Sequence, residues 1–349
     1  MNESTTPVRD AHRFPTGPLG DYLSSTLGLR GPLAVEQFAG GQSNPTYLIR
    51  VGGERLVLRR KPPGTLLPSA HAVDREYRVL RALADSAVPV ARALALCEEP
   101  TVIGSTFYLM DYVEGRIFWN PQLPELAAAE RAAIYDEMNR VIAALHSLDP
   151  EALGLGDYGR SGAYVARQVA RWSKQYKASE TRHIESMERL IDWLPAHAPS
   201  DEDSRLVHGD FRLDNLIFHP TEPRVLAVID WELSTLGHPL ADFAYHAMIW
   251  HIAPSDKGLS GLAGVHLRAL GIPDEAQYKT LYCQRAQRRR IDNWDYYLIF
   301  NLFRAAAILQ GVAARAAQGN ASSALAAERG RQAAPMADLA WSKAQHIGS

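Results

Sequence analysis

The feature that most constrains this chain is an eight-residue run followed by a short predicted hairpin. The run is His208-Gly209-Asp210-Phe211-Arg212-Leu213-Asp214-Asn215, and Asp230 comes fifteen residues after its end. Residues 215–218 and 225–229 are largely apolar and flank the proline-containing turn 219–223, which predicts two antiparallel strands. Because the midpoint between Asn215 and Asp230 falls inside the turn, we expect these two residues to lie opposite each other at the open end of the hairpin.

The oxygen-bearing side chains at this end of the hairpin suit phosphoryl transfer. The Asp230 carboxylate and the Asn215 amide oxygen are hard ligands of the kind that Mg²⁺ takes. Asp210, on the loop entering the hairpin, is placed to accept the proton of an attacking hydroxyl, and His208 precedes it by two residues, as in protein-kinase catalytic loops. Each residue alone is equally well explained as a turn or helix cap. One hairpin would have to align all three by chance, so the joint signal is strong.

The first third of the chain supplies candidates for binding a nucleotide. A loop between two strands has bare backbone that could fold over phosphates, although most Gly-Gly pairs are only hairpin turns: Gly40, Gly41, Gln42, Ser43 and Asn44. On the next strand Arg59 is the first candidate for the phosphate-binding cation and Lys61 the second, with Glu76 on the following helix to hold it. The alternative for these three is a solvated surface charge. Backbone groups for an adenine edge would come from Met110, Asp111 and Val113.

The pattern along the chain predicts a two-lobed α+β fold. Short strands are expected at 33–38, 47–51 and 56–59, with Gly52-Gly53 as a two-residue hairpin turn. A helix with apolar spacing begins near Val73, and Ser69 is available near its start as a cap. Two more strands are expected near 101–103 and 107–110. These elements form a small antiparallel sheet carrying one helix.

After Gly115 the apolar residues follow a helical spacing, which predicts a larger, mainly helical lobe that also contains the catalytic hairpin. Helices are expected at 134–145, at 164–176, at 186–194 with Pro195 closing it, and at 278–317 with a break near Asp292-Asn293. The predicted division is therefore residues 1–29 as a tail and first helix, 30–113 as a nucleotide-binding lobe, and 114–349 as a catalytic and substrate-binding lobe.

Composition excludes several classes of function. With a net charge of −2 and 22% charged residues, no global field draws the chain to nucleic acid or to an anionic membrane. Two cysteines, Cys97 and Cys283, form no disulfide framework or zinc site and fit a reducing compartment. No stretch looks long and apolar enough to span a membrane, and the polar residues 1–18 do not resemble a signal peptide. We expect a cytoplasmic protein.

The chain resembles the aminoglycoside-phosphotransferase and choline-kinase family, which has a protein-kinase-like fold. It is most similar to the branch in which such a kinase domain is fused ahead of an acyl-CoA dehydrogenase. The stretches that carry the resemblance are 38–47, 57–64, 70–76, 208–215 and 230–242, the last with the sequence Asp230-Trp231-Glu232-Leu233-Ser234-Thr235-Leu236-Gly237-His238-Pro239-Leu240-Ala241-Asp242.

The resemblance implies a role for each matching residue. Asp210 would be the catalytic base, Asn215 and Asp230 the Mg²⁺ ligands, His208 a shaper of the loop, and Asp242 its brace. The phosphate donor would be ATP or GTP. Arg59 stands where many relatives have lysine, which changes a point charge into a planar fork.

Where protein kinases continue the metal-binding aspartate with Phe-Gly, this chain has Trp231-Glu232, and no activation segment is recognisable. This departure makes a protein acceptor improbable. A dehydrogenase would need a flavin-binding domain for which this chain has no room, so we expect a kinase that transfers phosphate to an alcohol group. A dehydrogenase would be a functional partner at most.

The fusion in relatives suggests a hydroxyacyl-CoA or hydroxy acid as the acceptor. Arginines at 285 and 288–290 could meet CoA phosphates, and the aromatic residues of 294–303 could line an acyl channel; a solvated turn and a core helix are the commoner explanations. Candidate acceptor-binding residues are Arg212, Trp231, Glu232, Trp172, Tyr176 and Arg304. A kinase of an aminoglycoside, a choline-like amine or a sugar remains an alternative, as does a non-catalytic nucleotide-binding protein. The oligomeric state is not readable from the sequence.

Overall fold

The computed structural model describes residues 5–39, 44–62, 72–200, 203–256, 258–318 and 326–347. The chain divides into two compact units, each built from more than one segment. The first unit contains residues 1–118, 153–155 and 214–234, and the second contains the remainder. The catalytic hairpin, which the sequential division placed with residues 114–349, therefore groups with the first unit.

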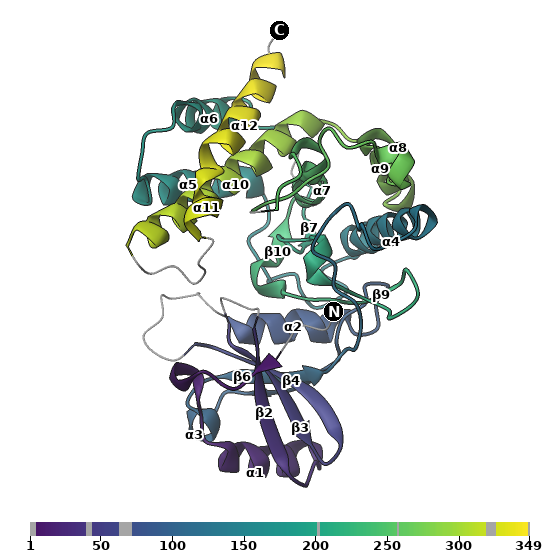
Figure 1. Ribbon diagram of the computed structural model, residues 1–349, viewed down its shortest axis with the longest axis vertical. Helices are drawn as coiled ribbons and strands as arrows, with labels where there is room; N and C mark the ends of the chain where they lie inside the picture. Colours follow the sequence, from purple (N-terminus) through teal and green to yellow (C-terminus); the bar gives the residue numbers. More distant parts are fainter. Residues whose placement is uncertain are drawn as a thin grey trace. The chain divides into compact units, whose positions relative to one another are not determined.

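The first unit is built on a six-stranded antiparallel sheet in the order β1-β2-β3-β4-β6-β5 (Figure 1). The strands are β1 (Thr5–Thr6), β2 (Leu33–Phe38), β3 (Thr46–Val51), β4 (Glu54–Arg60), β5 (Ala93–Cys97) and β6 (Phe107–Asp111). Its helices are α1 (Thr16–Leu27), α2 (Val73–Leu83) and the single-turn α3 (Pro100–Ile103), with a 3₁₀ turn at Asp10–His12. The predicted antiparallel sheet carrying a helix is confirmed.

The turn between β3 and β4 follows the prediction made from Gly52-Gly53. Both residues have positive φ, 58° and 91°, the conformation that a two-residue hairpin turn needs and that glycine adopts without a Cβ penalty. One face of the sheet packs against α1. Leu19 and Leu23 of this helix share a core with Tyr47 and Ile49 of β3. Leu56 and Leu58 of β4, the strand that carries Arg59, belong to the same core.

One predicted strand is wrong. Residues 101–103 form part of the helical turn α3, which has Pro100 at its first position and ends at Gly104 with φ of 84°. The β-branched residues Thr101, Val102 and Ile103 favour a strand locally, but proline fixes φ for the first helical turn and glycine ends it. The missing strand is β5, whose alternating burial fits one face against the core.

The predicted catalytic hairpin consists of β8 (Leu216–Phe218) and β9 (Val225–Val228). Its fit against the preceding chain depends on Gly115, because a Cβ there would lie 2.2 Å from the carbonyl oxygen of Phe218. The backbones of Arg116 and Phe218 exchange two hydrogen bonds of 2.7 and 2.8 Å. The chain thus leaves the sheet and binds directly to the hairpin within the same unit.

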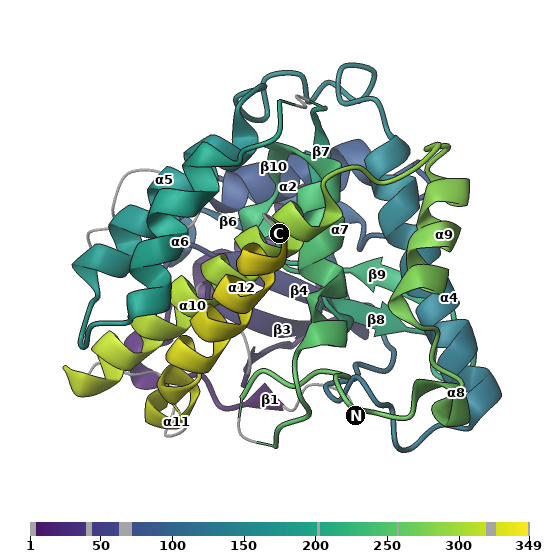
Figure 2. The ribbon, with the colours of Figure 1, turned by 90° about the horizontal axis from the view of Figure 1, so that it is seen from above.

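The second unit is mainly helical, and α10 is its central helix (Figure 2). Helices α5, α6, α7, α11 and α12 all contact α10. The helices are α4 (Ala128–Ser147), α5 (Tyr164–Ala178), α6 (Glu185–Ala196), α7 (Pro239–Ala247), α8 (Leu267–Leu270), α9 (Glu275–Arg285), α10 (Trp294–Ala317), α11 (Ala326–Arg331) and α12 (Ala333–Ile347). The break between α9 and α10 was predicted, whereas α6 runs one residue past Pro195 instead of ending before it.

A two-stranded ladder in this unit sets the start of the catalytic loop. Strand β7 (Arg205–Val207) pairs antiparallel with β10 (Thr235–Gly237), with Val207 opposite Thr235. His208 therefore follows directly after β7, and α7 begins two residues after β10. The ladder brings the loop and the first turn of α7 together.

Helix α10 corrects the expectation that no segment is long and apolar enough to span a membrane. Trp294–Ala317 passes that test by length and composition, and 83% of its most apolar window is buried inside the structure. The core helix of a globular unit meets the same criteria.

Candidate active site

A buried cation, Arg59 on β4, organises the polar residues of the first unit. Its Nε lies 2.8 Å from Oε2 of Glu76 on α2, and its Nη2 lies 2.7 Å from Oδ1 of Asp230. Glu232 is a third anionic neighbour at 3.5 Å. Burial lowers the pKa of Arg59, but the charges of Glu76 and Asp230 raise it above its ordinary value overall, so the guanidinium remains charged.

The Glu76 carboxylate is almost completely buried and is held at both oxygens. The Asn44 amide donates to Oε1 at 2.8 Å, and the Tyr108 hydroxyl donates to Oε2 at 3.1 Å. Burial raises the pKa of Glu76, and the charge of Arg59 opposes this rise. The predicted pairing of Arg59 with Glu76 is present, whereas Lys61 instead pairs with Asp74 at 3.2 Å.

Asp230 leaves the hairpin in a conformation uncommon for a residue with a Cβ. Its φ is 65°, in the left-handed region, and it precedes the 3₁₀ turn Trp231–Leu233. Asn215 ends the 3₁₀ turn Leu213–Asn215 before β8, and its carbonyl accepts a 3.0 Å hydrogen bond from the Ile229 N–H. Asn215 is therefore opposite Ile229 and not, as predicted, opposite Asp230. An irregularity between Ile217 and Phe218 shifts the register by one residue.

The predicted catalytic loop, which begins at His208 in the second unit, is anchored on one buried carboxylate, Asp242 in the first turn of α7. Its two oxygens accept the backbone N–H groups of His208 at 2.8 Å and Gly209 at 2.9 Å, and His146 lies 3.2 Å away. Burial raises the pKa of Asp242, but the contacts with His146 and His208 lower it below its usual value overall. Gly209 has a φ of 82°, which explains the glycine in the run.

Asp210 lies at the centre of a cluster of side chains in the same unit. The Tyr245 hydroxyl donates to its Oδ1 at 2.5 Å, and Arg212 Nε is 3.2 Å from the same oxygen. The backbone N–H of Asp210 donates to Nδ1 of the buried His208 at 3.2 Å, so His208 shapes the loop. Arg304 donates to the Gly209 carbonyl at 2.6 Å.

These residues match a known set of proteins. A model of the phosphotransferase enzyme family matches residues 34–281. The chain belongs to this family. It is a small-molecule phosphotransferase with the kinase-like fold of these enzymes, an antiparallel N-terminal sheet and a helical C-terminal part.

Relatives of this phosphotransferase have varied names. Acyl-CoA dehydrogenase family member 10 of Mus musculus is 50% identical over 347 residues, which are 99% of this chain but 32% of that protein. A solved Ralstonia eutropha protein described as a candidate aminoglycoside phosphotransferase is 53% identical, with a TM-score of 0.88 over 96% of this chain and 99% of that one. The chain spans about a third of the mouse relative, and the match covers only its phosphotransferase part.

A more distant solved structure shows the fold alone. Aminoglycoside phosphotransferase APH(4)-Ia, in a complex with ADP and hygromycin B, is 18% identical with a TM-score of 0.61. The alignment covers 93% of this chain and 98% of that one.

The remaining candidate nucleotide-binding residues have mixed outcomes. Gly40, Gly41, Gln42 and Ser43 lie outside the described residues, whereas Asn44 holds Glu76. Met110 and Asp111 end β6, and the Asp111 side chain pairs with Arg92 at 3.1 Å. Val113 follows the strand with no regular structure of its own. Backbone contact between the 110–113 segment and a nucleotide therefore stays a prediction.

The candidate acceptor-binding residues differ in their surroundings, and only some of them lie beside the predicted catalytic loop. Trp172 and Arg304 lie beside the catalytic loop, because the Arg304 guanidinium is 5.5 Å from the centre of the Trp172 ring and reaches Gly209. Glu232 is instead engaged with Arg59 in the first unit. The prediction that Trp231 binds the acceptor is corrected. Trp231 is buried, and its indole N–H donates to the Val228 carbonyl at 2.9 Å, so it is a core residue. Tyr176 is also fully buried.

Core packing explains the aromatic residues that were predicted to line an acyl channel. Ion pairs explain most of the arginines that were predicted to bind CoA phosphates. The aromatic residues of α10 are all buried in the core of the second unit. Arg285 pairs with Asp136 at 2.7 Å, Arg288 pairs with Asp203, and Arg290 pairs with Asp292 at 2.7 Å. A cavity of about 500 Å³ is lined by Arg288, Arg289, Arg290 and Asp292.

Tyr245 is a functional-site candidate that was not predicted from the sequence. It lies three residues after Asp242 in α7, a spacing that places both on one face of a helix. Because Asp242 was already expected to brace the loop, the helical spacing could have identified Tyr245 as a second contact. His146, which supports Asp242 from α4, had no comparable local signal.

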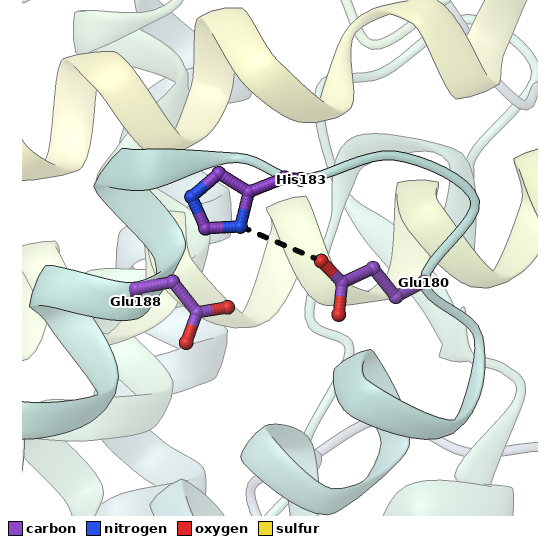
Figure 3. Close-up of side chains that lie close together, drawn as sticks. All are labelled: Glu180, His183 and Glu188. Atoms are coloured by element: carbon purple, nitrogen blue, oxygen red, sulfur yellow. Dashed lines mark ion pairs between the residues drawn. The ribbon is translucent and has the colours of Figure 1, made fainter.

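A separate group of side chains comes from the connection between α5 and α6 and from the first turn of α6. Glu180, His183 and Glu188 bring one ligating atom each to within 4.8 Å of the others, and Figure 3 shows the ring of His183 facing Glu180. Lys177 contacts the Glu188 carboxylate, and His183 is 3.2 Å from Glu185. Because cations already meet these acids at an exposed surface, we interpret the group as an ion-pair network.

Replacing Arg59 should destabilise the protein strongly. We expect Arg59→Met to lower the free energy of unfolding by about 3–5 kcal/mol, because Glu76 would remain buried without its cation. Adding Glu76→Gln should restore much of this loss, as measured by chemical denaturation. Arg55→Met is the matched control: it lies on the same strand, its pair with Glu114 is exposed, and its loss should stay below about 1 kcal/mol. Equal losses for the two variants would contradict the assigned role of Arg59.

The second unit should lose stability as the pH is lowered, and His246 should be the residue responsible. Burial lowers the pKa of His246 to about 4, while its ring contacts the Tyr278 hydroxyl at 2.7 Å. Because the unfolded chain takes up a proton near pH 6.5 and the folded chain only near pH 4, stability is lost as pH falls between these values. At pH 5 the loss should be about 2 kcal/mol relative to pH 7.

Denaturant titrations at both pH values measure this loss. His246→Gln should remove most of the pH-dependent difference, whereas the exposed His197→Gln should keep it. An unchanged slope in His246→Gln would show that another group is responsible.

Proposed function

We propose that this phosphotransferase moves the γ-phosphate of ATP to a hydroxyl group of a small anionic acceptor, a hydroxyacyl-CoA or a hydroxy acid. The observation that carries the proposal is Arg59, whose guanidinium contacts both Glu76 and Asp230. A permanently charged fork beside the candidate metal carboxylate suits the phosphates of a nucleotide. The ADP complex of APH(4)-Ia supports the choice of an adenine nucleotide.

Asn215 and Asp230 are the residues that would hold Mg²⁺. Their donor set fits this ion, because one carboxylate and one amide oxygen are hard ligands, and Mg²⁺ in such enzymes takes one or two carboxylates together with substrate phosphates. When bound, the ion would neutralise charge on the phosphates. The left-handed turn at Asp230 supports a functional role, since strained residues concentrate at such sites.

Asp210 would act on the acceptor. Its carboxylate accepts the proton of the acceptor hydroxyl as the oxygen forms a bond to the γ-phosphorus and the bond to the β-phosphate oxygen breaks. The products are a phosphate ester, ADP and one proton.

The cationic side chains near Asp210 favour an anionic acceptor. Arg212 contacts the carboxylate of Asp210, and Arg304 contacts the loop at Gly209. An aminoglycoside or choline carries positive charge and would be repelled by these guanidinium groups. The names of the dehydrogenase relatives add a thioester as a candidate, because a fused enzyme would act on the same class of molecule. An aminoglycoside is the second candidate acceptor, because the Ralstonia relative is described as an aminoglycoside phosphotransferase.

A mass-spectrometric screen tests the proposal. The protein is incubated with ATP, Mg²⁺ and, in separate reactions, hydroxyacyl-CoAs, free hydroxy acids, aminoglycosides and choline. We expect the mass of one phosphoryl group to be added to a hydroxyacyl-CoA or hydroxy acid. Phosphorylation of aminoglycosides or choline alone would contradict the acceptor class.

Asp210→Asn should lower turnover with the best acceptor by about 10²–10⁴-fold, because the amide cannot take up the proton. Asp149→Asn makes the same substitution at an exposed turn, where the side chain accepts a hydrogen bond from the Glu151 N–H, and should leave turnover unchanged. Wild-type turnover in Asp210→Asn would remove the assignment of the base.

A further inference from the structure

Helix α7 contacts the catalytic loop at two levels. Asp242, in its first turn, binds the backbone N–H groups of His208 and Gly209. Tyr245, three residues later, binds the side chain of Asp210 itself at 2.5 Å. One rigid element thus fixes both the backbone of the loop and the carboxylate that the loop presents.

The Tyr245 hydroxyl is a donor in this contact. The Tyr245 side chain is almost fully buried, and both burial and the negative charge of Asp210 raise its pKa above the usual value. The phenol therefore keeps its proton, and its hydrogen bond to Asp210 is charge-assisted. The 2.5 Å distance between the two oxygens makes this a direct contact.

The aromatic ring of Tyr245 is itself held in place. The guanidinium carbon of Arg304 lies 4.6 Å from the ring centre, and its Nη2 donates to the Gly209 carbonyl at 2.6 Å. Trp172 packs on the same guanidinium at 5.5 Å. Arg304 is almost fully buried, so the Tyr245 ring and the loop backbone share one fixed neighbour.

We propose that Tyr245 is a positioning residue for the Asp210 base. Its hydroxyl holds Oδ1 and fixes the rotation of the carboxylate about its Cβ–Cγ bond, so that an acceptor hydroxyl meets the base in one orientation. Correct orientation of a reacting group lowers the barrier without tightening ground-state binding. This inference rests on the proposed function, because it requires Asp210 to be the base.

Tyr245→Phe removes only the hydroxyl and tests the inference. We expect kcat to fall by about ten- to hundredfold, the range for a hydrogen bond to a charged group, with little change in KM for ATP. Tyr135→Phe is the matched control, because this buried tyrosine in the same unit also makes a 2.5 Å hydrogen bond, to the Pro121 carbonyl. Both variants should lose similar thermal stability, and only Tyr245→Phe should lose turnover. Wild-type kcat in Tyr245→Phe would overturn the inference.

A double-mutant cycle shows whether Tyr245 acts through Asp210. Single-turnover transfer is measured with γ-labelled ATP in Asp210→Asn, with and without Tyr245→Phe. If Tyr245 only orients the carboxylate, its loss should add little to the Asp210→Asn defect. An undiminished, multiplicative effect of Tyr245→Phe would instead show that the hydroxyl acts elsewhere, and would overturn the inference.

The two proposals fail in distinguishable ways. Full turnover in Asp210→Asn removes the base and with it the proposed function. An inactive Asp210→Asn together with a fully active Tyr245→Phe removes only the role of Tyr245.

Discussion

The ion pairs of Arg59 are the interaction on which the first unit depends. A buried guanidinium is tolerated only when it is paired, and Arg59 is paired with residues from two separate elements, Glu76 of α2 and Asp230 at the end of the hairpin. The planar guanidinium suits this position, since Nη2 donates a hydrogen bond to Asp230 while Nε lies 2.8 Å from the Glu76 carboxylate. A lysine offers a single point charge and could hold one carboxylate at this distance more easily than two. The sheet, the helix and the hairpin are therefore joined by one side chain.

The second unit is organised by a charge of the opposite sign. Asp242 is buried and accepts backbone donors from the catalytic loop, while His146 approaches from α4. Tyr245 and Arg304 then fix what the loop presents. Both units use the same physical principle: a charge removed from water is stable only if its partners are complete, and complete partners hold their elements in a single arrangement.

The sequence predicted those parts of the structure that local chemistry determines. The Gly52-Gly53 turn follows from backbone conformation, and the pairing of Arg59 with Glu76 follows from the neighbouring pattern. The bracing role of Asp242 was implied by the resemblance to the phosphotransferase family. The strand predicted at 101–103 is wrong, because the helical-turn preference set by Pro100 and Gly104 outweighs the strand preference of three β-branched residues. The predicted register of the hairpin is wrong by one residue. Phe218 pairs with Val225 next to the turn, and the one-residue irregularity between Ile217 and Phe218 then places Asn215 opposite Ile229; neither feature has a clear sequence signal. Trp231 was a candidate acceptor-binding residue, but its side chain is buried and donates to the Val228 carbonyl.

The central claim is that Asn215 and Asp230 bind the metal ion of a nucleotide. A crystal structure of the protein with Mg²⁺ and the non-hydrolysable analogue AMP-PNP tests it most directly. We expect Mg²⁺ to be bound by the Asn215 amide oxygen and an Asp230 carboxylate oxygen, each at about 2.0–2.1 Å, together with phosphate oxygens of the analogue. A metal ion held by other residues, or a nucleotide bound away from Asp230 and Arg59, would contradict it.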